Sequence, residues 1–123
     1  MSGGRVLLID DDEGFRGLVG VMLTAAGCAV QAAANGKIGL ACYREQRADV
    51  VITDILMPEA EGLETIQALK DFDPDVKIIA MSGAGGGQFS HLESAMAFGA
   101  RRILHKPFSR TELLSTVADL LGG

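Results

Sequence analysis

The sequence is poor in cysteine and histidine, the residues that build disulfides and sites for softer metals. It contains two of each among its 123 residues, and they do not cluster. Cys28 and Cys42 lie in segments expected to belong to the core, and their separation does not suit a shared metal. We therefore expect two buried free thiols in a reducing cytoplasm.

Basic residues are also outnumbered. Eleven lysines and arginines against sixteen aspartates and glutamates leave a formal net charge of −5. This balance argues against nucleic acid or an anionic membrane surface as a direct partner. The hydrophobic fraction of 48% and the charged fraction of 22% are those of an ordinary soluble protein. At this length, residues 1–123 are expected to form one domain around a single core.

One long stretch has no charge at all. Gly17–Gly36 is about as long as a membrane span, but Thr24, Gln31 and Asn35 interrupt it. Its residues also follow two different periodicities. We interpret the stretch as a core helix followed by a core strand, with no membrane contact. The N-terminus lacks the basic region and apolar block of a signal peptide, so a cytoplasmic location is expected.

Hydrophobic periodicity divides the rest of the chain into alternating strands and helices. Short apolar runs predict five buried strands, at residues 5–9, 28–32, 49–53, 76–81 and 102–105. Apolar residues at helical spacing follow each strand. The predicted core positions include Phe15, Leu18, Val19, Tyr43, Ile66, Ala95 and Leu113. Strands and helices that alternate through short loops indicate a parallel sheet covered on both faces.

Capping signals mark the ends of three of the predicted helices. Asp11 or Asp12 is placed to cap the first helix, and Gly27 to end it in the left-handed conformation. The spacing of Ser90 and Glu93 predicts a capping box for a helix that ends near Gly99. A second box, at 109 and 112, opens the last helix.

Polar residues lie at the carboxyl ends of four of the five predicted strands, where parallel sheets bind their ligands. They are Asp10, Asp11, Asp54, Ser82 and Lys106. Any one of them is explained by a helix cap or a solvated loop charge. All of them together on one edge indicate a functional site.

The residue types at this edge suit phosphoryl transfer. Crowded carboxylates repel one another unless cations compensate their charge. Lys106 supplies one positive charge, and the remainder suits a divalent ion that prefers hard oxygen ligands, such as Mg²⁺. A carboxylate on Mg²⁺, beside a lysine and a hydroxyl group, is equipped to accept a phosphoryl group as a nucleophile. Asp54, at the end of a rigid buried strand, is the candidate nucleophile.

With these motifs the chain resembles a receiver domain of the response regulators of two-component signalling. The resemblance covers essentially the whole length, and the order and spacing of its motifs are specific in combination. The motifs are Asp10-Asp11, Asp54 to Gly62, Met81-Ser82-Gly83, Gly99-Ala100 and Lys106-Pro107-Phe108. The resemblance implies an α/β fold, a single (βα)5 flavodoxin-like domain with a five-stranded parallel sheet in the order 2-1-3-4-5.

The resemblance also implies a role for each site residue. Asp54 corresponds to the phosphoacceptor. Asp11 and Asp54 would bind Mg²⁺ or Mn²⁺ directly, Asp10 would act through water, and the backbone carbonyl of Leu56 would complete the metal ligands. Ser82 and Lys106 correspond to the hydroxyl and the ammonium group that contact phosphoryl oxygens. The Lys106–Pro107 peptide bond is expected to be cis.

Three features depart from the family pattern. Ile103 stands where an aromatic reporter of phosphorylation is usual, so an aromatic switch is not expected. The segment Gly83–Gly87 is rich in glycine, which predicts a mobile loop that orders on phosphorylation. Leu56 and Ala84 cannot align a hydrolytic water, so we expect a long-lived aspartyl phosphate.

The function implied is a signalling switch, and not an enzyme that acts on a separate substrate. The expected phosphoryl donor is a sensor histidine kinase or a histidine phosphotransfer protein. The expected output is a downstream protein partner or an output domain of a larger chain, and the resemblance also allows a weak homodimer. Two alternatives stay open: a receiver-like interaction module that is never phosphorylated, and a Mg²⁺-dependent phosphatase that uses Asp10 and Asp12.

Overall fold

Five parallel strands form one sheet in the order β2-β1-β3-β4-β5, as the family resemblance implied. The structure, a computed structural model, describes residues 4–55, 61–82, 96 and 99–122, with the backbone alone for Glu61 and Ser82. The strands are β1 (Arg5–Ile9), β2 (Ala29–Ala33), β3 (Val50–Asp54), β4 (Ile78–Ser82) and β5 (Arg102–His105).

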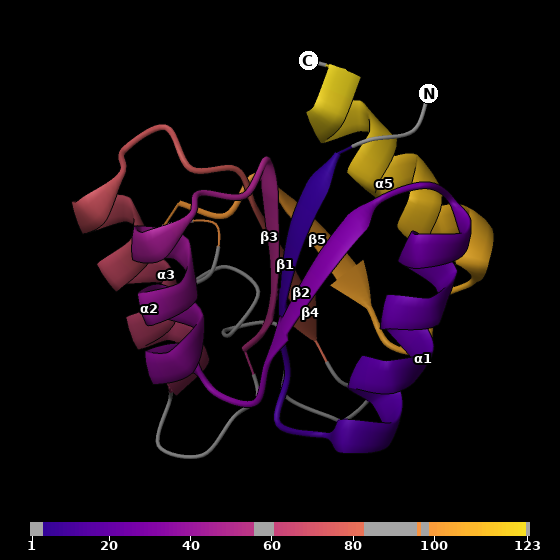
Figure 1. Cartoon of the computed structure of the whole chain (residues 1–123), viewed down its shortest axis with the longest axis horizontal. Coiled ribbons are helices and arrows are strands. Elements are labelled where there is room, and N and C mark those ends of the chain that lie inside the picture. The colour runs from indigo at the N-terminus through magenta and orange to yellow at the C-terminus, as the bar shows by residue number, and fades with distance from the viewer. Residues whose placement is uncertain (1–3, 56–60, 83–95, 97–98, 123) are drawn as a thin grey trace.

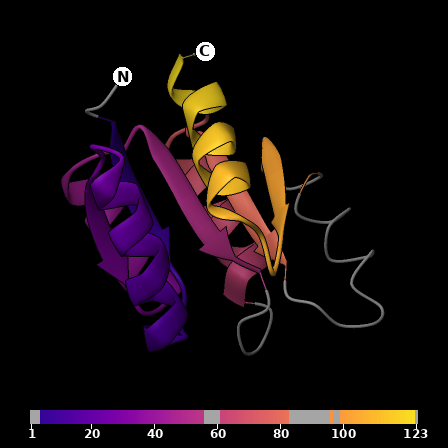
Figure 2. The same cartoon turned by 90° about the vertical axis from the view of Figure 1, so that its right-hand side faces the viewer.

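Helices cover both faces of this sheet. The four that the structure describes are α1 (Glu13–Ala25), α2 (Gly36–Glu45), α3 (Glu61–Phe72) and α5 (Arg110–Gly122). Figure 1 shows α2 and α3 on one face and α1 and α5 on the other, and the view from the side in Figure 2 agrees. The capping box predicted at residues 90 and 93 lies outside the described residues. Of the helix predicted between residues 90 and 99, the structure describes Met96, which is helical and 49% exposed, and the expected end at Gly99, where φ is 121°.

Successive side chains of β1 point to opposite faces of the sheet and belong to two core clusters, one on each face. Leu7 and Ile9 belong to a buried cluster beneath α2 and α3, whereas Val6 and Leu8 belong to one beneath α1 and α5. Successive side chains of a strand point to opposite faces, so a strand between two helical layers is apolar over most of its length. This explains why β1 and β3 have no alternation of polar and apolar residues.

Helix α1 begins and ends where its capping signals predict. The side chain of Asp12 accepts a hydrogen bond from the backbone N–H of Phe15 at 3.1 Å, which makes Asp12 the N-cap. After the helix, Gly27 has a φ of 95°, a conformation that favours glycine. One predicted core position is wrong, because Leu18 is 53% exposed. The stripe that packs on the sheet is therefore narrower than the apolar spacing suggested.

The uncharged stretch from Gly17 to Gly36 is a helix followed by a strand, as predicted. It contains most of α1 and all of β2. In the described part of the chain, no helix has the length and apolar character needed to cross a membrane.

Helix α5 opens with the predicted capping box. The backbone N–H of Glu112 donates to the Ser109 hydroxyl oxygen at 3.0 Å, and the N–H of Ser109 donates to a Glu112 carboxylate oxygen at 3.1 Å. These reciprocal bonds satisfy two backbone donors that the helix itself leaves unpaired. The cap fixes the start of α5 just after Lys106 and Pro107.

We expect Ser109→Ala to lower the free energy of unfolding by about 1 kcal/mol, because it leaves the N–H of Glu112 without its partner. Chemical denaturation measures this change, provided that the unfolding free energy of both proteins depends equally on denaturant concentration. Ser115→Ala, at an exposed site within the same helix, is the control and is expected to change stability little or to raise it slightly. Equal losses in the two variants would contradict the capping role.

Three local predictions need correction. Strands β2, β3 and β4 begin and end one or two residues later than predicted, because their limits follow pairing between strands, which hydrophobicity does not encode. Cys28 and Cys42 are free thiols but only partly buried. The strand predicted at residues 102–105 is only partly buried, because its last residue, His105, is exposed on the edge strand β5 and does not pack at the edge of the core.

Candidate functional site

The pairing of β1 with β3 places Asp10 and Asp54 side by side. In this ladder Ile9 pairs with Thr53, so the next residue of each strand reaches the same level at the carboxyl edge of the sheet. The backbone of Asp10 is fixed by a hydrogen bond from its N–H to the carbonyl oxygen of Ala33 in β2, at 3.1 Å. Both carboxylates therefore stand on rigid backbone.

Lys106 reaches the two carboxylates from the end of the edge strand β5. It follows β5, and its peptide bond with Pro107 is cis, as predicted. Its Nζ donates to Asp10 Oδ2 at 3.0 Å and to Asp54 Oδ2 at 2.9 Å. The structure thus brings together residues from three strand ends that the sequence separates widely.

Burial makes the charges of this group strongly dependent on one another. Asp10 is fully buried and Asp54 is 5% exposed. Burial raises the pKa of Asp10, although a hydrogen bond from the Asp12 N–H and the ammonium group of Lys106 act against this rise. For Lys106, burial alone lowers the pKa, but the hydrogen bonds to Asp54 and Asp10 outweigh it and the net pKa lies above its ordinary value.

A third carboxylate completes an oxygen-lined site. Asp10, Asp11 and Asp54 each offer a carboxylate oxygen, and these three oxygens lie within 4.8 Å of one another. Asp11 is exposed, so the group is open to solvent on one side. Asp12 is not part of it, because its side chain caps α1. Lys106 forms salt bridges with Asp10 and Asp54, and three clustered carboxylates are the donor set that a hard divalent cation prefers.

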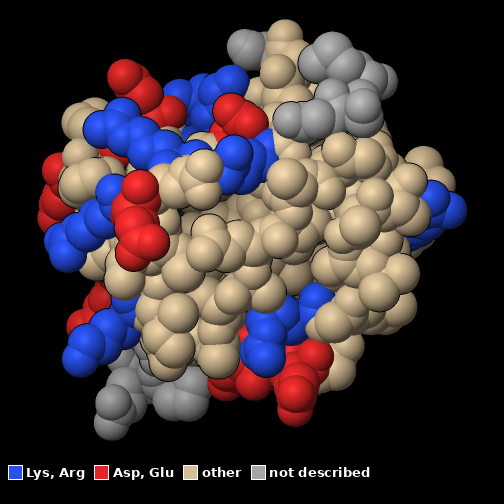
Figure 3. Space-filling view, viewed as in Figure 1, with Lys and Arg blue, Asp and Glu red and all other residues tan. Residues whose placement is uncertain are grey.

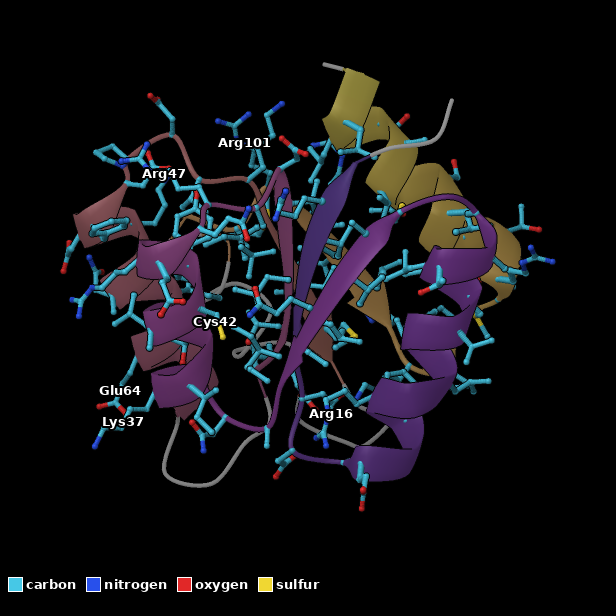
Figure 4. The ribbon with its side chains drawn as sticks, in the orientation of Figure 1. Arg16, Lys37, Cys42, Arg47, Glu64 and Arg101 are labelled. Carbon is cyan, nitrogen blue, oxygen red and sulfur yellow. The ribbon has the colours of Figure 1, made fainter. Side chains whose placement is uncertain are left out.

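Two residues of α1 contact this group although the sequence did not assign them to the site. The Nζ of Lys106 lies 4.1 Å from the centre of the Phe15 ring, and that ring packs edge-on against Phe108. Arg16 donates from Nη1 to the backbone carbonyl of Asp10 at 2.7 Å, and Figure 4 shows it between α1 and the end of β1. Helical spacing predicted a buried Phe15, but no local pattern relates α1 to the residues after β5.

Several predicted site residues lie outside the described parts of the chain. These are Leu56 with its carbonyl, Ala84, the glycine-rich segment 83–87 and the side chain of Ser82, although the backbone of Ser82 ends β4 at the expected edge. Ile103 is described: it is half-buried and packs against the cluster beneath α2 and α3. Arg101, just before β5, and Arg102, its first residue, are both exposed.

Known proteins similar to the chain share one domain. Residues 6–118 match the response regulator receiver domain. The chemotaxis protein CheY of Thermotoga maritima is 34% identical over 116 residues, which are 94% of this chain and 95% of that protein. The DNA-binding transcriptional regulator NtrC of Azospirillum brasilense is 33% identical over 121 residues, but these are only 25% of its length. The chain thus spans nearly all of one relative and a quarter of another.

Solved structures give the same result. A response regulator receiver domain protein from Clostridium thermocellum has a TM-score of 0.89 at 27% identity, over 97% of this chain and 94% of that one. The chemotaxis protein CheY4 of Vibrio cholerae has a TM-score of 0.88 at 30% identity, over 98% of this chain and all of that one. With strand order, acidic edge and sequence in agreement over this length, the chain belongs to the response regulator receiver domain family of two-component signalling.

Proposed function

We propose that Asp54 accepts a phosphoryl group from a phosphohistidine, in a reaction that depends on Mg²⁺ or Mn²⁺. One observation carries the proposal: the buried Asp54 carboxylate is hydrogen-bonded to Lys106 and lies within 4.8 Å of two other carboxylates. A carboxylate oxygen attacks phosphorus, the P–O bond forms, and the P–N bond to the donor histidine breaks. The donor would be a sensor histidine kinase or a histidine phosphotransfer protein.

Lys106 is the proposed electrostatic partner of the transferred group. Its ammonium group already bridges Asp10 and Asp54, so it stands where negative charge accumulates on the phosphoryl oxygens. The ring of Phe15 beneath it and the double hydrogen bond limit its motion. Ser82 is the proposed hydroxyl donor to another phosphoryl oxygen, on the basis of its position at the end of β4.

The acidic residues fit a hard divalent cation. All the side chains that offer ligand atoms in the group are carboxylates, and their oxygens lie within 4.8 Å of one another. Asp11 and Asp54 would hold the ion directly, Asp10 would act through water, and Leu56 would contribute its carbonyl. The bound ion would supply positive charge to the phosphoryl oxygens.

The proposed output is a change in the surface that partners bind. Ile103 is an aliphatic residue that already packs against the core, so the signal would not pass through rotation of an aromatic side chain at this position. The partner would be another protein or an output domain of a longer chain, since relatives such as NtrC carry this domain within a longer protein. The location we propose is the cytoplasm.

One alternative is weakened by the geometry. A phosphatase that uses Asp10 and Asp12 needs both carboxylates in one site, but Asp12 is exposed and caps α1. The other alternative, an interaction module that is never phosphorylated, differs from the proposal in a single measurable property, the covalent adduct at Asp54.

We expect a covalent adduct after incubation with Mg²⁺ and a small-molecule phosphodonor such as acetyl phosphate. The adduct should survive acid, be removed by hydroxylamine, and fall to background in Asp54→Asn, because an amide is not a nucleophile of this kind. Intact-protein mass spectrometry measures it. Asp12→Asn is the matched control and should keep the adduct, since asparagine also caps helices. An unmodified wild-type chain would favour the interaction module, and turnover of a phosphate ester would favour the phosphatase.

A further inference from the structure

Strand β2 is an edge strand without the usual protection. It lies at the end of the sheet, and Ala29, Gln31 and Ala32 are exposed. Figure 1 shows β2 in front of the other strands, turned toward the viewer. Edge strands normally carry lysine, proline or a bulge that prevents pairing with another chain. The five residues of β2, Ala-Val-Gln-Ala-Ala, include none of these residue types.

The hydrogen bonds of β2 identify the backbone groups that point outward. The N–H of Ala29 donates to the carbonyl of Gly4, and the carbonyl of Ala33 accepts from Asp10, so these two residues face β1. In a parallel ladder the residues of a strand face its two sides alternately. The N–H and carbonyl groups of Val30 and Ala32 therefore point away from the sheet.

The surface around this edge carries no charge, in a chain with a net charge of −5. Figure 3 shows a broad band without acidic or basic side chains over β2 and α1, bounded by charged groups above and below. Two copies of an acidic protein repel each other through most of their surfaces. They can meet at this band without placing like charges in contact.

We propose that a second copy of the chain pairs with this edge, so that the β2 strands run antiparallel about a two-fold axis at Gln31. Val30 of one copy then lies opposite Ala32 of the other, and each such pair exchanges two hydrogen bonds. Gln31 lies opposite Gln31 of the other copy, and this pair exchanges no backbone hydrogen bonds. The two sheets become one continuous sheet. The proposal is independent of phosphorylation at Asp54.

The helix beside this edge has the shape that such pairing requires. α1 packs on both β1 and β2. With strands about 4.8 Å apart, the α1 helices of the two copies would lie roughly 9–10 Å apart, which is a normal distance for packed helices. At Gly17 and Gly20 an added Cβ would meet nothing within 4 Å. Together with Val21, Thr24, Ala25 and Val30, these glycines line a shallow surface depression of about 520 Å³.

The opposite face of the sheet also offers apolar surface near the edge. α2 contacts β1 and β2, so the α2 helices of the two copies would approach each other across the same axis. Figure 4 shows Cys42 on the side of α2 turned toward β2. Ile38 lies one turn earlier on that side and is 47% exposed. An exposed isoleucine beside an uncharged edge strand supports burial by a second copy.

Cysteine cross-linking tests the proposed register. In a background with Cys28→Ser and Cys42→Ser, Gln31→Cys places two thiols opposite each other at a Cα separation of about 4.5 Å, which suits a disulfide. Ala29→Cys is the matched control: it is equally exposed, but it would lie opposite Ala33 of the other copy and about 13 Å from its own equivalent. We expect the Gln31→Cys dimer to form at least about tenfold faster under mild oxidation. Equal rates would overturn the register.

Sedimentation equilibrium tests the dimer itself. The wild-type chain should dimerise reversibly, and more strongly at higher salt, where repulsion between acidic copies is screened. Ala32→Pro removes an outward N–H and leaves the pairing with β1 intact, so it should weaken dimerisation at least about tenfold without unfolding the chain. Gln31→Glu, which sets two carboxylates face to face, should do the same. A wild-type monomer at millimolar concentration, or dimers unaffected by both substitutions, would overturn the proposal.

Discussion

Replacing Gly62 with alanine is expected to cost about 3 kcal/mol of unfolding free energy. Gly62 lies near the start of α3, where the helix comes closest to the end of β3. An alanine Cβ would overlap the backbone of Ile55 and lie 2.5 Å from the carbonyl oxygen of Asp54. Backbone atoms cannot rotate away as a side chain can, so α3 or the end of β3 must shift. Chemical denaturation measures the loss.

The same substitution should also impair the site, because the clash falls on the backbone of Asp54 itself. We expect slower formation of the phosphoryl adduct in the fraction of Gly62→Ala that remains folded. Gly17→Ala is the matched control, since its Cβ meets nothing within 4 Å. An exposed helical glycine replaced with alanine should gain up to about 1 kcal/mol. Changes of the same sign in both variants would show that the contact at Gly62 is not the cause.

Replacing Lys106 with methionine is expected to cost about 3 kcal/mol at neutral pH in the absence of divalent cations. Methionine keeps most of the stem but removes the charge that bridges Asp10 and Asp54, both of which are buried. The two carboxylates would then face each other without the ammonium group of Lys106. Lys37→Met, on the exposed surface of α2, is the control and should change stability by less than about 0.5 kcal/mol.

The pH dependence of this loss follows from the pKa shifts. The pKa of Lys106 is raised in the folded state, so its contribution is complete below the ordinary lysine pKa of 10.5 and is lost only as pH rises through the higher folded value. The pKa of Asp10 is also raised, so folding favours its protonated form, and acidification from neutral pH toward 3.8 relieves its charge. In Lys106→Met, protonation of Asp10 should therefore stabilise the folded state more than it does in the wild type.

The difference in stability between wild type and Lys106→Met should therefore shrink as pH falls from 7 toward 4. Millimolar Mg²⁺ at neutral pH should shrink it too, because a bound cation replaces part of the missing charge and stabilises the folded state in proportion to its binding. Urea titrations across pH, with and without Mg²⁺, measure both effects. A difference that grows on acidification would contradict the role of Lys106 as the partner of two buried acids.

Much of this molecule was predictable from local patterns. The continuous apolar runs of β1 and β3 identify strands buried on both faces, and the capping residues Asp12 and Ser109 mark the starts of their helices. These features depend on interactions within a few residues, which the linear order of the chain expresses directly. The meeting of Asp10, Asp54 and Lys106 was predictable because strand ends of a parallel sheet share one edge.

Other features were decided by contacts between distant segments. Hydrophobic spacing does not distinguish Leu18, which is 53% exposed, from Val19, which is fully buried, because the width of the contact with the sheet depends on how α1 docks. The place of Phe15 beneath Lys106 depends on the path of the chain after β5. Burial of Asp10, which raises its pKa, follows from the packing around the carboxyl edge.

The sequence by itself therefore determined the alternation of strands and helices, the order of the strands through family resemblance, and the carboxylates and lysine at one edge. Only the tertiary structure decided which α1 residues complete the site and that β2 leaves an uncharged edge with outward backbone groups. The physical reason is the same in both cases. Local periodicity records which residues avoid water, whereas partners across the fold are chosen by packing and hydrogen bonding between segments far apart in the chain.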